Sequence, residues 1–124
     1  MEEKIKQIYA SSKSYPELVG KLIEIGVQSY TVDTATSIIL YRFANGENLL
    51  QSHSEMNRTI SRAFSQEETI QAIRSNQQGK TDYPTFMNDI AQAGVRFYEA
   101  TLTGNKKRVT YIGSGGFYEE QIPL

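Results

Sequence analysis

The chain repeats a pattern of residues at a separation of 68 positions. The repeated markers are a Tyr-Pro pair, a Gly-Val pair and a later tyrosine, namely Tyr15-Pro16 with Tyr83-Pro84, Gly26-Val27 with Gly94-Val95, and Tyr30 with Tyr98. Five of the sixteen positions in 15–30 are identical to their counterparts in 83–98, whereas average composition would give about one. Because the markers keep their spacing, we predict two copies of one structural unit.

Each marker suits a particular place in a helix or a strand. Proline has a fixed φ and no N–H, so Pro16 and Pro84 fit the first turn of a helix. A glycine after an apolar helical stretch can adopt the left-handed conformation that ends the helix, so we expect positive φ at Gly26 and Gly94. The apolar residues between the markers have helical spacing, which predicts that they face a core. Those expected in the core are Leu22, Ile23, Met87 and Ile90.

Hydrophobic periodicity and turn residues predict the same elements in both units. In the first unit we expect helices over about 2–12 and 16–25, and strands near 27–33, 37–44 and 48–53. In the second unit we expect helices over about 66–76 and 84–93, and strands near 95–102, 107–112 and 117–122. Continued at the same separation, the repeat places Phe43 on Tyr111, and Leu49-Leu50 on Phe117-Tyr118.

The predicted strands alternate between apolar and polar residues, which is typical of an antiparallel sheet with one face covered. We therefore predict a single α+β domain over 1–124, built from two tandem ααβββ units with all helices packed on one face of the sheet. The units cover about 2–53 and 67–122 and are joined by 54–66. Within the joint, apolar spacing through Ile60, Ala63 and Phe64 predicts a short helix in 54–64.

Composition excludes several classes of function. The net charge is −1, so no field of the whole molecule attracts nucleic acid or anionic lipid. The chain has no cysteine and one histidine, which leaves only an all-carboxylate metal site, and no acidic loop has the spacing for one. The start of the sequence does not resemble a signal peptide. We therefore expect a cytoplasmic protein with no metal, no cofactor and no membrane contact.

One stretch resembles a known family. The residues from Gln77 to Phe86, followed by Ala93-Gly94-Val95, are similar to a signature of small bacterial proteins, some of which are labelled phage envelope proteins and encoded in prophages. The C-terminal segment 119–124 is similar to the same family, and the resemblance covers essentially the whole chain. The family has no established activity, so the resemblance implies a phage-derived accessory protein and assigns no catalytic residue.

His53 is the one candidate catalytic residue. A histidine can act as a general base near neutral pH, with Glu55, Asp33 or Glu47 orienting it, which gives a small-molecule enzyme as one alternative. The plainer interpretation is a solvated histidine at the end of a strand.

The segment 96–108 offers a second alternative. It brings Arg96 and the basic run Lys106–Arg108 near Tyr98 and Tyr111, and such mixtures bind single-stranded nucleic acid. However, the tyrosines alternate onto the face expected to be buried, and lysines at a hairpin tip commonly only keep an edge soluble. We therefore expect no nucleic-acid partner.

The glycine-rich run 113–116 follows a strand and precedes another, so we expect a β-turn there and no phosphate site.

The loop from Gln77 to Asp82 has no counterpart in the first unit, so it is free of the packing that the repeat imposes. We predict a non-enzymatic binding domain whose site lies where the two units meet, near this loop and the joint. The candidate binding residues are Gln78, Lys80 and Asp82 of the loop, with Glu55 and Arg58 of the joint. Tyrosines at matched positions add hydroxyl groups, so a polar small ligand or a protein segment is the expected partner.

Overall fold

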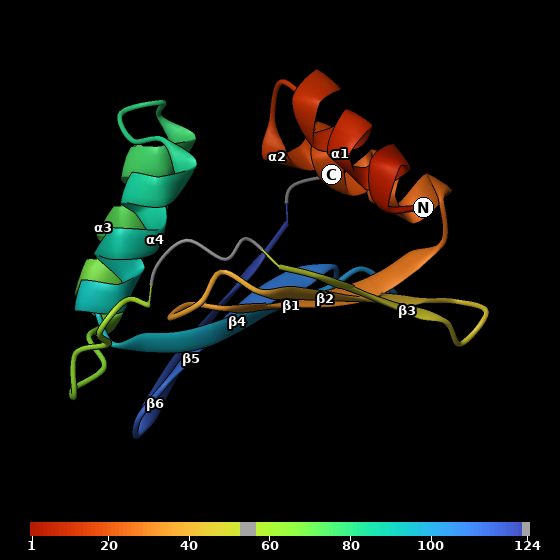
Figure 1. Cartoon of the computed structure of the whole chain (residues 1–124). Coiled ribbons are helices and arrows are strands. Elements are labelled where there is room, and N and C mark those ends of the chain that lie inside the picture. Colours follow the sequence, from red (N-terminus) through yellow and green to blue (C-terminus); the bar gives the residue numbers. More distant parts are fainter. Residues whose placement is uncertain (53–56, 123–124) are drawn as a thin grey trace.

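The computed structural model describes residues 1–52 and 57–122, and these form the predicted order of elements (Figure 1). The first unit contains α1 (Glu2–Ser11), α2 (Tyr15–Glu24), β1 (Val27–Asp33), β2 (Ile39–Phe43) and β3 (Asn48–Gln51). The second contains α3 (Gln66–Gln77), α4 (Tyr83–Gln92), β4 (Val95–Thr101), β5 (Arg108–Gly113) and β6 (Gly116–Gln121). No helix in these ranges is long and apolar enough to cross a membrane.

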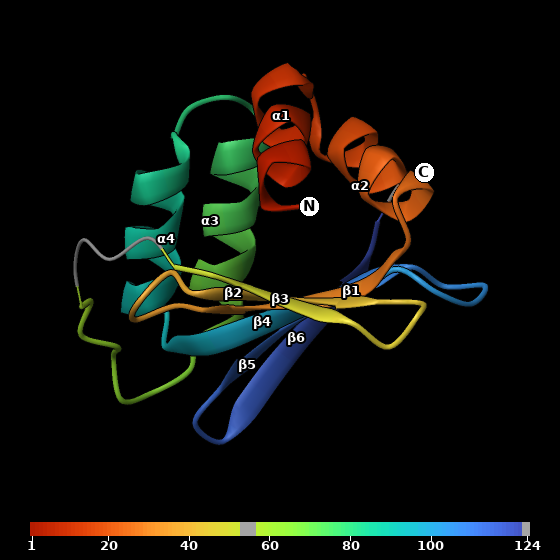
Figure 2. The same ribbon diagram turned by 45° about the vertical axis from the view of Figure 1, so that its right-hand side comes forward.

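The strands form one antiparallel sheet in the order β3-β2-β1-β4-β5-β6. Each unit supplies a three-stranded meander, and the two meanders join where β1 pairs with β4. Both helix pairs lie on the same side of the sheet, with α1 and α2 over one part and α3 and α4 over another (Figures 1 and 2). The predicted α+β class is confirmed, with helices on one face of the sheet.

Local signals mark the starts and the ends of the helices. Ser14, Ser65 and Asp82 each accept a hydrogen bond from a backbone N–H in the first turn of α2, α3 and α4, respectively. Gly26 and Gly94 have φ of 94° and 87°, which confirms the left-handed conformation after α2 and α4.

The β1–β4 pair has a symmetrical register. Thr31 lies opposite Glu99. The residue pairs at equal distances on the two sides of this central pair consist of corresponding residues of the two units, with the roles of β1 and β4 interchanged. Each strand also carries an irregularity at the same place, between Val27 and Ser29 in β1 and between Val95 and Phe97 in β4. The repeat of 68 positions therefore holds through the centre of the sheet.

Beyond the central strands the predicted alignment is wrong. Tyr30 pairs with Tyr41 and Tyr98 with Tyr111, so Tyr41, and not Phe43, corresponds to Tyr111. The register moves by two residues because the paired tyrosines are eleven apart in the first unit and thirteen apart in the second. At the edge strands, Leu49 pairs with Tyr41 and Tyr118 with Tyr111, so Tyr118 corresponds to Leu49 and not to Leu50.

The core lies between the helices and the sheet. Leu22, Met87 and Ile90 are fully buried there, and Ile23 is partly buried against the same cluster. The predicted short helix in the joint is not present in its described part, 57–64. Phe64 instead packs as a single side chain against the core, because glycines in the neighbouring hairpin leave room for its ring.

Candidate functional site

The structure describes some of the predicted site residues and not others. His53 and Glu55 lie outside the described residues, so the enzyme hypothesis based on His53 stays a prediction. Gln78, Lys80 and Asp82 are exposed in the loop between α3 and α4.

The loop is held in place by hydrogen bonds of its own. Asn76 Nδ2 donates to the Thr81 carbonyl at 3.0 Å, and the Lys80 backbone N–H donates to the Ser75 carbonyl at 2.9 Å. Asp82 Oδ1 accepts from the Thr85 N–H at 2.9 Å, and hydrogen bonds from Thr85 lower the pKa of Asp82. Asp82 therefore has a structural role as the cap of α4.

Arg58 ties the joint to both units. Its Nη1 donates to Ser37 Oγ at 2.6 Å and to the Thr34 carbonyl at 3.3 Å, both in the β1–β2 connection. Its Nε donates to Asn88 Oδ1 on α4 at 2.8 Å. Asn88 lies six residues beyond Asp82, about 9 Å along the helix, so these contacts hold the Arg58 head well below the loop.

All eight tyrosines of the chain lie on the helix side of the sheet, around the place where the two units meet. We call this cluster the tyrosine seam. It contains five tyrosines from strands and three from helices, namely Tyr30, Tyr41, Tyr98, Tyr111 and Tyr118, and Tyr9, Tyr15 and Tyr83. Neighbouring rings on the strands pack with centroid distances of 5.8 Å for Tyr30–Tyr41, 5.3 Å for Tyr98–Tyr111 and 6.4 Å for Tyr111–Tyr118.

Two hydroxyl pairs repeat between the units. The Tyr15 and Tyr30 hydroxyls lie 2.5 Å apart, and the Tyr83 and Tyr98 hydroxyls lie 3.4 Å apart. Each pair joins the first residue of a helix to the fourth residue of a strand. The Tyr-Pro and Tyr markers of the sequence are therefore partners in space.

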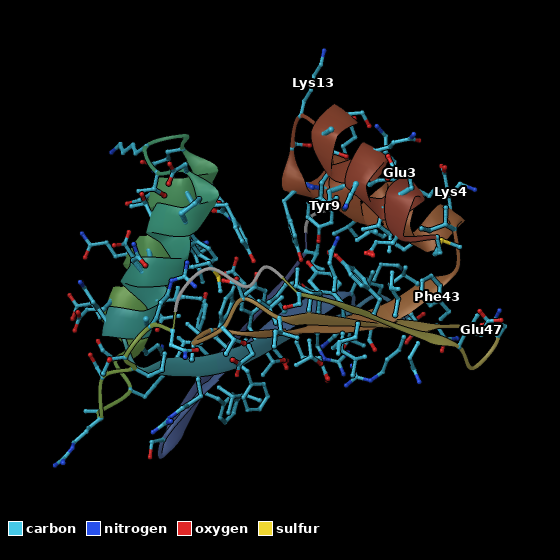
Figure 3. The ribbon with its side chains drawn as sticks, viewed as in Figure 1. Glu3, Lys4, Tyr9, Lys13, Phe43 and Glu47 are labelled. Atoms are coloured by element: carbon cyan, nitrogen blue, oxygen red, sulfur yellow. The ribbon has the colours of Figure 1, made fainter. Side chains whose placement is uncertain are left out.

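A third group of hydroxyls lies at the first-unit end of the seam. The Tyr41 hydroxyl is 3.1 Å from the Tyr9 hydroxyl and 3.1 Å from Gln51 Oε1. Because the Gln51 carbonyl oxygen can only accept, the single Tyr41 proton serves Gln51, and Tyr41 accepts from Tyr9. Figure 3 shows Tyr9 on the side of α1 that faces the seam.

The opposite end of the seam carries an ion pair. The Tyr118 hydroxyl donates to Glu120 Oε1 at 2.8 Å, and Arg74 Nη1 on α3 lies 3.1 Å from the same oxygen. By strand pairing, Glu120 occupies the position that Gln51 has in the first unit, since they lie opposite Val109 and Ile39. Each end of the seam therefore offers a side-chain oxygen to a tyrosine hydroxyl.

Burial keeps these phenols neutral. It raises the pKa of both Tyr15 and Tyr41 to about 12, and it raises the pKa of Tyr30 and Tyr98 well above the ordinary value. Repulsion between ionised hydroxyls adds to this effect across the seam, because a charge on Tyr83 further raises the pKa of Tyr15 and Tyr41. At neutral pH the seam is a set of uncharged hydroxyls that both donate and accept.

The tyrosines of the seam differ in their exposure to solvent. Tyr41 and Tyr30 are 0% and 2% exposed, whereas Tyr9 and Tyr83 are 39% and 43% exposed. Within the described ranges, Thr34 Oγ1 is the one fully enclosed side-chain polar atom that lacks a hydrogen bond. Tyr111 is 6% exposed, and burial raises the pKa of its hydroxyl well above the ordinary value.

Two cavities lie away from the seam. One of about 220 Å³ lies between α3 and α4 and is lined by polar and acidic side chains such as Glu68, Gln71 and Asp89. The other, of about 320 Å³, lies at the end of the first unit beside Gly26, Phe43 and Leu49. Glu47, considered from the sequence as a partner of His53, lines the second cavity, whereas Gln78, Lys80, Asp82 and Arg58 line neither. No group of three potential metal-ligating side chains occurs within the described residues.

The structure does not form the nucleic-acid surface considered for 96–108. Tyr98 and Tyr111 are buried under the helices, while Arg96 and Lys106 are exposed. Arg108 lies on the helix-free face of the sheet, where its Nε is 3.5 Å from Glu119 Oε1. The basic residues and the aromatic rings therefore do not share a surface.

Sequence reasoning identified part of the seam. The matched positions of Tyr15 with Tyr83 and Tyr30 with Tyr98 indicate shared roles, and the excess of tyrosine indicates hydroxyl chemistry. Tyr9 and Tyr118 were not among the candidates, because neither has a tyrosine at its counterpart position. The high number of tyrosines in the chain is the one sequence signal that could have indicated Tyr9 and Tyr118 as members of the seam.

Comparison with known proteins places the chain in a family. A search of curated proteins finds no match. A family model described as "Protein of unknown function (DUF1398)" matches residues 3–116, which cover α1 from its second residue, the other helices and β1 to β5. The chain belongs to the DUF1398 family.

Proposed function

We propose that this protein is a non-enzymatic binding domain that holds a small, neutral, polar ligand at the tyrosine seam. The observation that carries the proposal is the convergence of eight tyrosines, drawn from three helices and five strands, on the place where the two units meet. Rings supply apolar contact and hydroxyls supply hydrogen bonds, a combination that suits ligands with hydroxyl or amide groups.

The state of the hydroxyls favours binding over catalysis. A phenol must ionise before it can act as a base or a nucleophile, and burial raises the pKa of Tyr30, Tyr98 and Tyr111 well above the ordinary value. Neutral hydroxyls pair best with neutral donors and acceptors, since a buried charge would need an opposite charge beside it. The nearest full charges at one end, Arg74 and Glu120, already neutralise each other.

The residues named from the sequence form the rim in this proposal. Tyr83, which is 43% exposed, follows Asp82 directly, and in this proposal the loop with Gln78 and Lys80 borders the seam at that tyrosine. Burial raises the pKa of Tyr83, and its hydrogen bond with Tyr98 and the positive charge of Arg58 partly offset that rise. Arg58 also donates to Asn88 on the helix that Tyr83 begins. Glu55 lies outside the described residues, so its part in the site stays a prediction.

The biological setting follows from the sequence resemblance. We assign the protein to a phage-derived accessory role in the cytoplasm, in which it holds a ligand of the host or the phage. The absence of cysteine and the resemblance of 77–95 to prophage-encoded proteins support this setting.

The test is a binding screen against neutral and charged pairs of compounds. Glucose and adenosine represent neutral ligands, and glucose phosphate and adenosine monophosphate are their charged counterparts. We expect a neutral member to raise the melting temperature and to bind in calorimetry, because ligands stabilise the state that binds them. Tyr83→Phe and Lys80→Ala should weaken this binding. Thr110→Val, which removes a hydroxyl on the helix-free face, is the matched control.

Binding of the phosphorylated members alone would contradict a neutral seam. Equal binding by Tyr83→Phe and the unchanged protein would exclude the seam as the site. Lys80→Ala is preferred to an Asp82 substitution, since Asp82 caps α4 and its loss would lower stability by about 1 kcal/mol.

A further inference from the structure

The second unit has a short segment lying across the end of α4. The Ser61 N–H donates to the Ala91 carbonyl at 3.0 Å, and the Ser65 N–H donates to the Ala93 carbonyl at 2.8 Å. The Ala91 carbonyl also accepts from the Gly94 N–H at 3.1 Å, so residues 61–65 add a second donor there and supply the donor for the Ala93 carbonyl at the end of α4.

Glycines make room for this segment. A Cβ added at Gly94 would collide with the Ala63 carbonyl and lie 2.8 Å from Phe64 Cα. Added Cβ atoms at Gly113 and Gly116 would lie 2.6 Å and 2.8 Å from ring atoms of Phe64. The backbone of the segment thus rests on Gly94, and its aromatic ring rests on the β5–β6 hairpin.

The corresponding surface of the first unit is open. Gly26 matches Gly94 in sequence and in its positive φ, yet a Cβ added at Gly26 would meet nothing within 4 Å. Strand pairing puts Phe43 at the position of Gly113, since they lie opposite Val27 and Val95. Among the described residues, no donor is bonded to the Ile25 carbonyl, which corresponds to that of Ala93.

The open surface is hollowed. The cavity of about 320 Å³ is lined there by Ile25, Gly26, Phe43, Ala44 and Leu49, with Glu47 and the start of α1 beside them. Figure 3 shows Phe43 and Glu47 at this end of the sheet, below the beginning of α1. We call these five lining residues the Gly26 groove.

We propose that the Gly26 groove binds a short peptide segment of a partner protein in the way that the second unit binds its own residues 61–65. Residues 61–65 of the second unit show which kind of peptide fits against such a helix end. An N–H of the peptide donates to the Ile25 carbonyl, and a small residue lies over Gly26, where a larger side chain would prevent close approach. An apolar side chain enters the cavity over Phe43 and Leu49.

Charge defines the rest of the peptide. In the second unit the residue before Ala63 is Arg62, which is exposed. The Gly26 groove has Glu47 at its rim, so a basic residue next to the small one finds an opposite charge. The peptide recognised is therefore of the pattern small, basic, small, apolar, small.

The test uses a labelled peptide with the sequence of residues 59–65, Thr-Ile-Ser-Arg-Ala-Phe-Ser, and the full chain with any tag at its C-terminal end. We expect saturable binding by fluorescence anisotropy. Ala44→Trp, which fills the groove, should weaken binding by at least about tenfold. Ser114→Trp, an exposed position in the hairpin of the second unit, is the matched control and should bind as the unchanged chain does. Tyr83→Phe should also bind the peptide, which separates this site from the seam.

Amide signals in an NMR titration distinguish the possible sites. Shifts at Ile25, Gly26 and Ala44 support the groove, whereas shifts at Gly94 and Gly113 would mean that the peptide only displaces the internal segment. No saturable binding, or equal binding by Ala44→Trp, would overturn the proposal. A concentration-dependent dimer that Ala44→Trp abolishes would also overturn it, because the occupant would then be a second copy of this chain.

Discussion

Thr31 and Glu99 lie opposite each other at the centre of the sheet, and Thr31 Oγ1 donates a hydrogen bond to Glu99 Oε1 at 3.1 Å. The two residues are also 68 positions apart, so Glu99 of the second unit is the counterpart of Thr31 in the first unit. Arg42 Nη1 completes this centre by donating to Thr31 Oγ1 at 2.8 Å. On the other face of the same strands, the symmetry brings the helix-start tyrosines of both units to one seam.

The two helix-ending glycines should respond differently to substitution. Gly26→Ala should lower the free energy of unfolding by about 1–2 kcal/mol, the cost of a side chain in the left-handed region. Gly94→Ala should cost about 1–3 kcal/mol more, because its Cβ would also collide with the backbone at Ala63 and Phe64. Urea denaturation of the two variants measures the difference. Equal losses would mean that the joint does not rest on Gly94.

A core substitution tests the orientation of α4. Ile90 is fully buried between this helix and the sheet. Ile90→Ala should therefore lower the free energy of unfolding by about 2–5 kcal/mol, as large-to-small core changes do. Gln92→Ala, an exposed change on the same helix, should have little effect in the same denaturation experiment. A loss at Ile90 no greater than that at Gln92 would contradict the packing described.

The hydroxyl pairs of the seam should contribute unequally to stability. Tyr15→Phe leaves the Tyr30 hydroxyl, on a side chain that is 2% exposed, without its partner at 2.5 Å. The expected loss is about 1–3 kcal/mol, the cost of an unsatisfied buried polar group. Tyr83→Phe should cost less, since the Tyr83–Tyr98 distance is 3.4 Å and Tyr83 is exposed. Thermal and chemical unfolding of both variants measure the two losses, and equal losses would contradict the difference between the two contacts.

Alkaline pH should unfold the protein. The pKa of Tyr15 and Tyr41 is raised to about 12 in the folded state, above the value of about 10 for an unfolded tyrosine. The unfolded chain then binds fewer protons than the folded chain above pH ~10, so the free energy of unfolding falls as pH rises from there through ~12. The ultraviolet absorbance of tyrosinate measures the titration. Its rise should coincide with loss of circular dichroism, and full ionisation near pH ~10 in a folded protein would contradict the buried seam.

The order of elements could be predicted because the signals for it are local. Pro16 and Pro84 start helices, Gly26 and Gly94 end them, and the alternation of Tyr30 with its neighbours marks a half-buried strand. The register at the outer strands could not be predicted, since it depends on how the β4–β5 connection accommodates two further residues. The packing of Phe64 could not be predicted for a similar reason, because the space for its ring is left by Gly113 and Gly116, which are distant in sequence.

The candidate site was partly predictable. A seam between repeated units follows from the repeat itself, and the matched tyrosines indicate hydroxyl groups there. The sequence suggests Asp82 of the loop as a ligand contact, and in the structure its carboxylate caps α4. A capping residue and an exposed binding residue look alike in a single sequence, because both are polar and precede an apolar helix.

The central claim is that ligands bind at the tyrosine seam, and tyrosine signals report on it directly because the chain has eight tyrosines and no tryptophan. The measurement is an NMR titration of protein with isotope-labelled tyrosine rings, using the neutral compound that stabilises the protein most in the binding screen. We predict that the ring signals of the exposed Tyr9 and Tyr83 shift together and saturate, and that Tyr83→Phe weakens the binding while Thr110→Val retains it. Saturable binding by calorimetry with all eight tyrosine signals unchanged would contradict the claim.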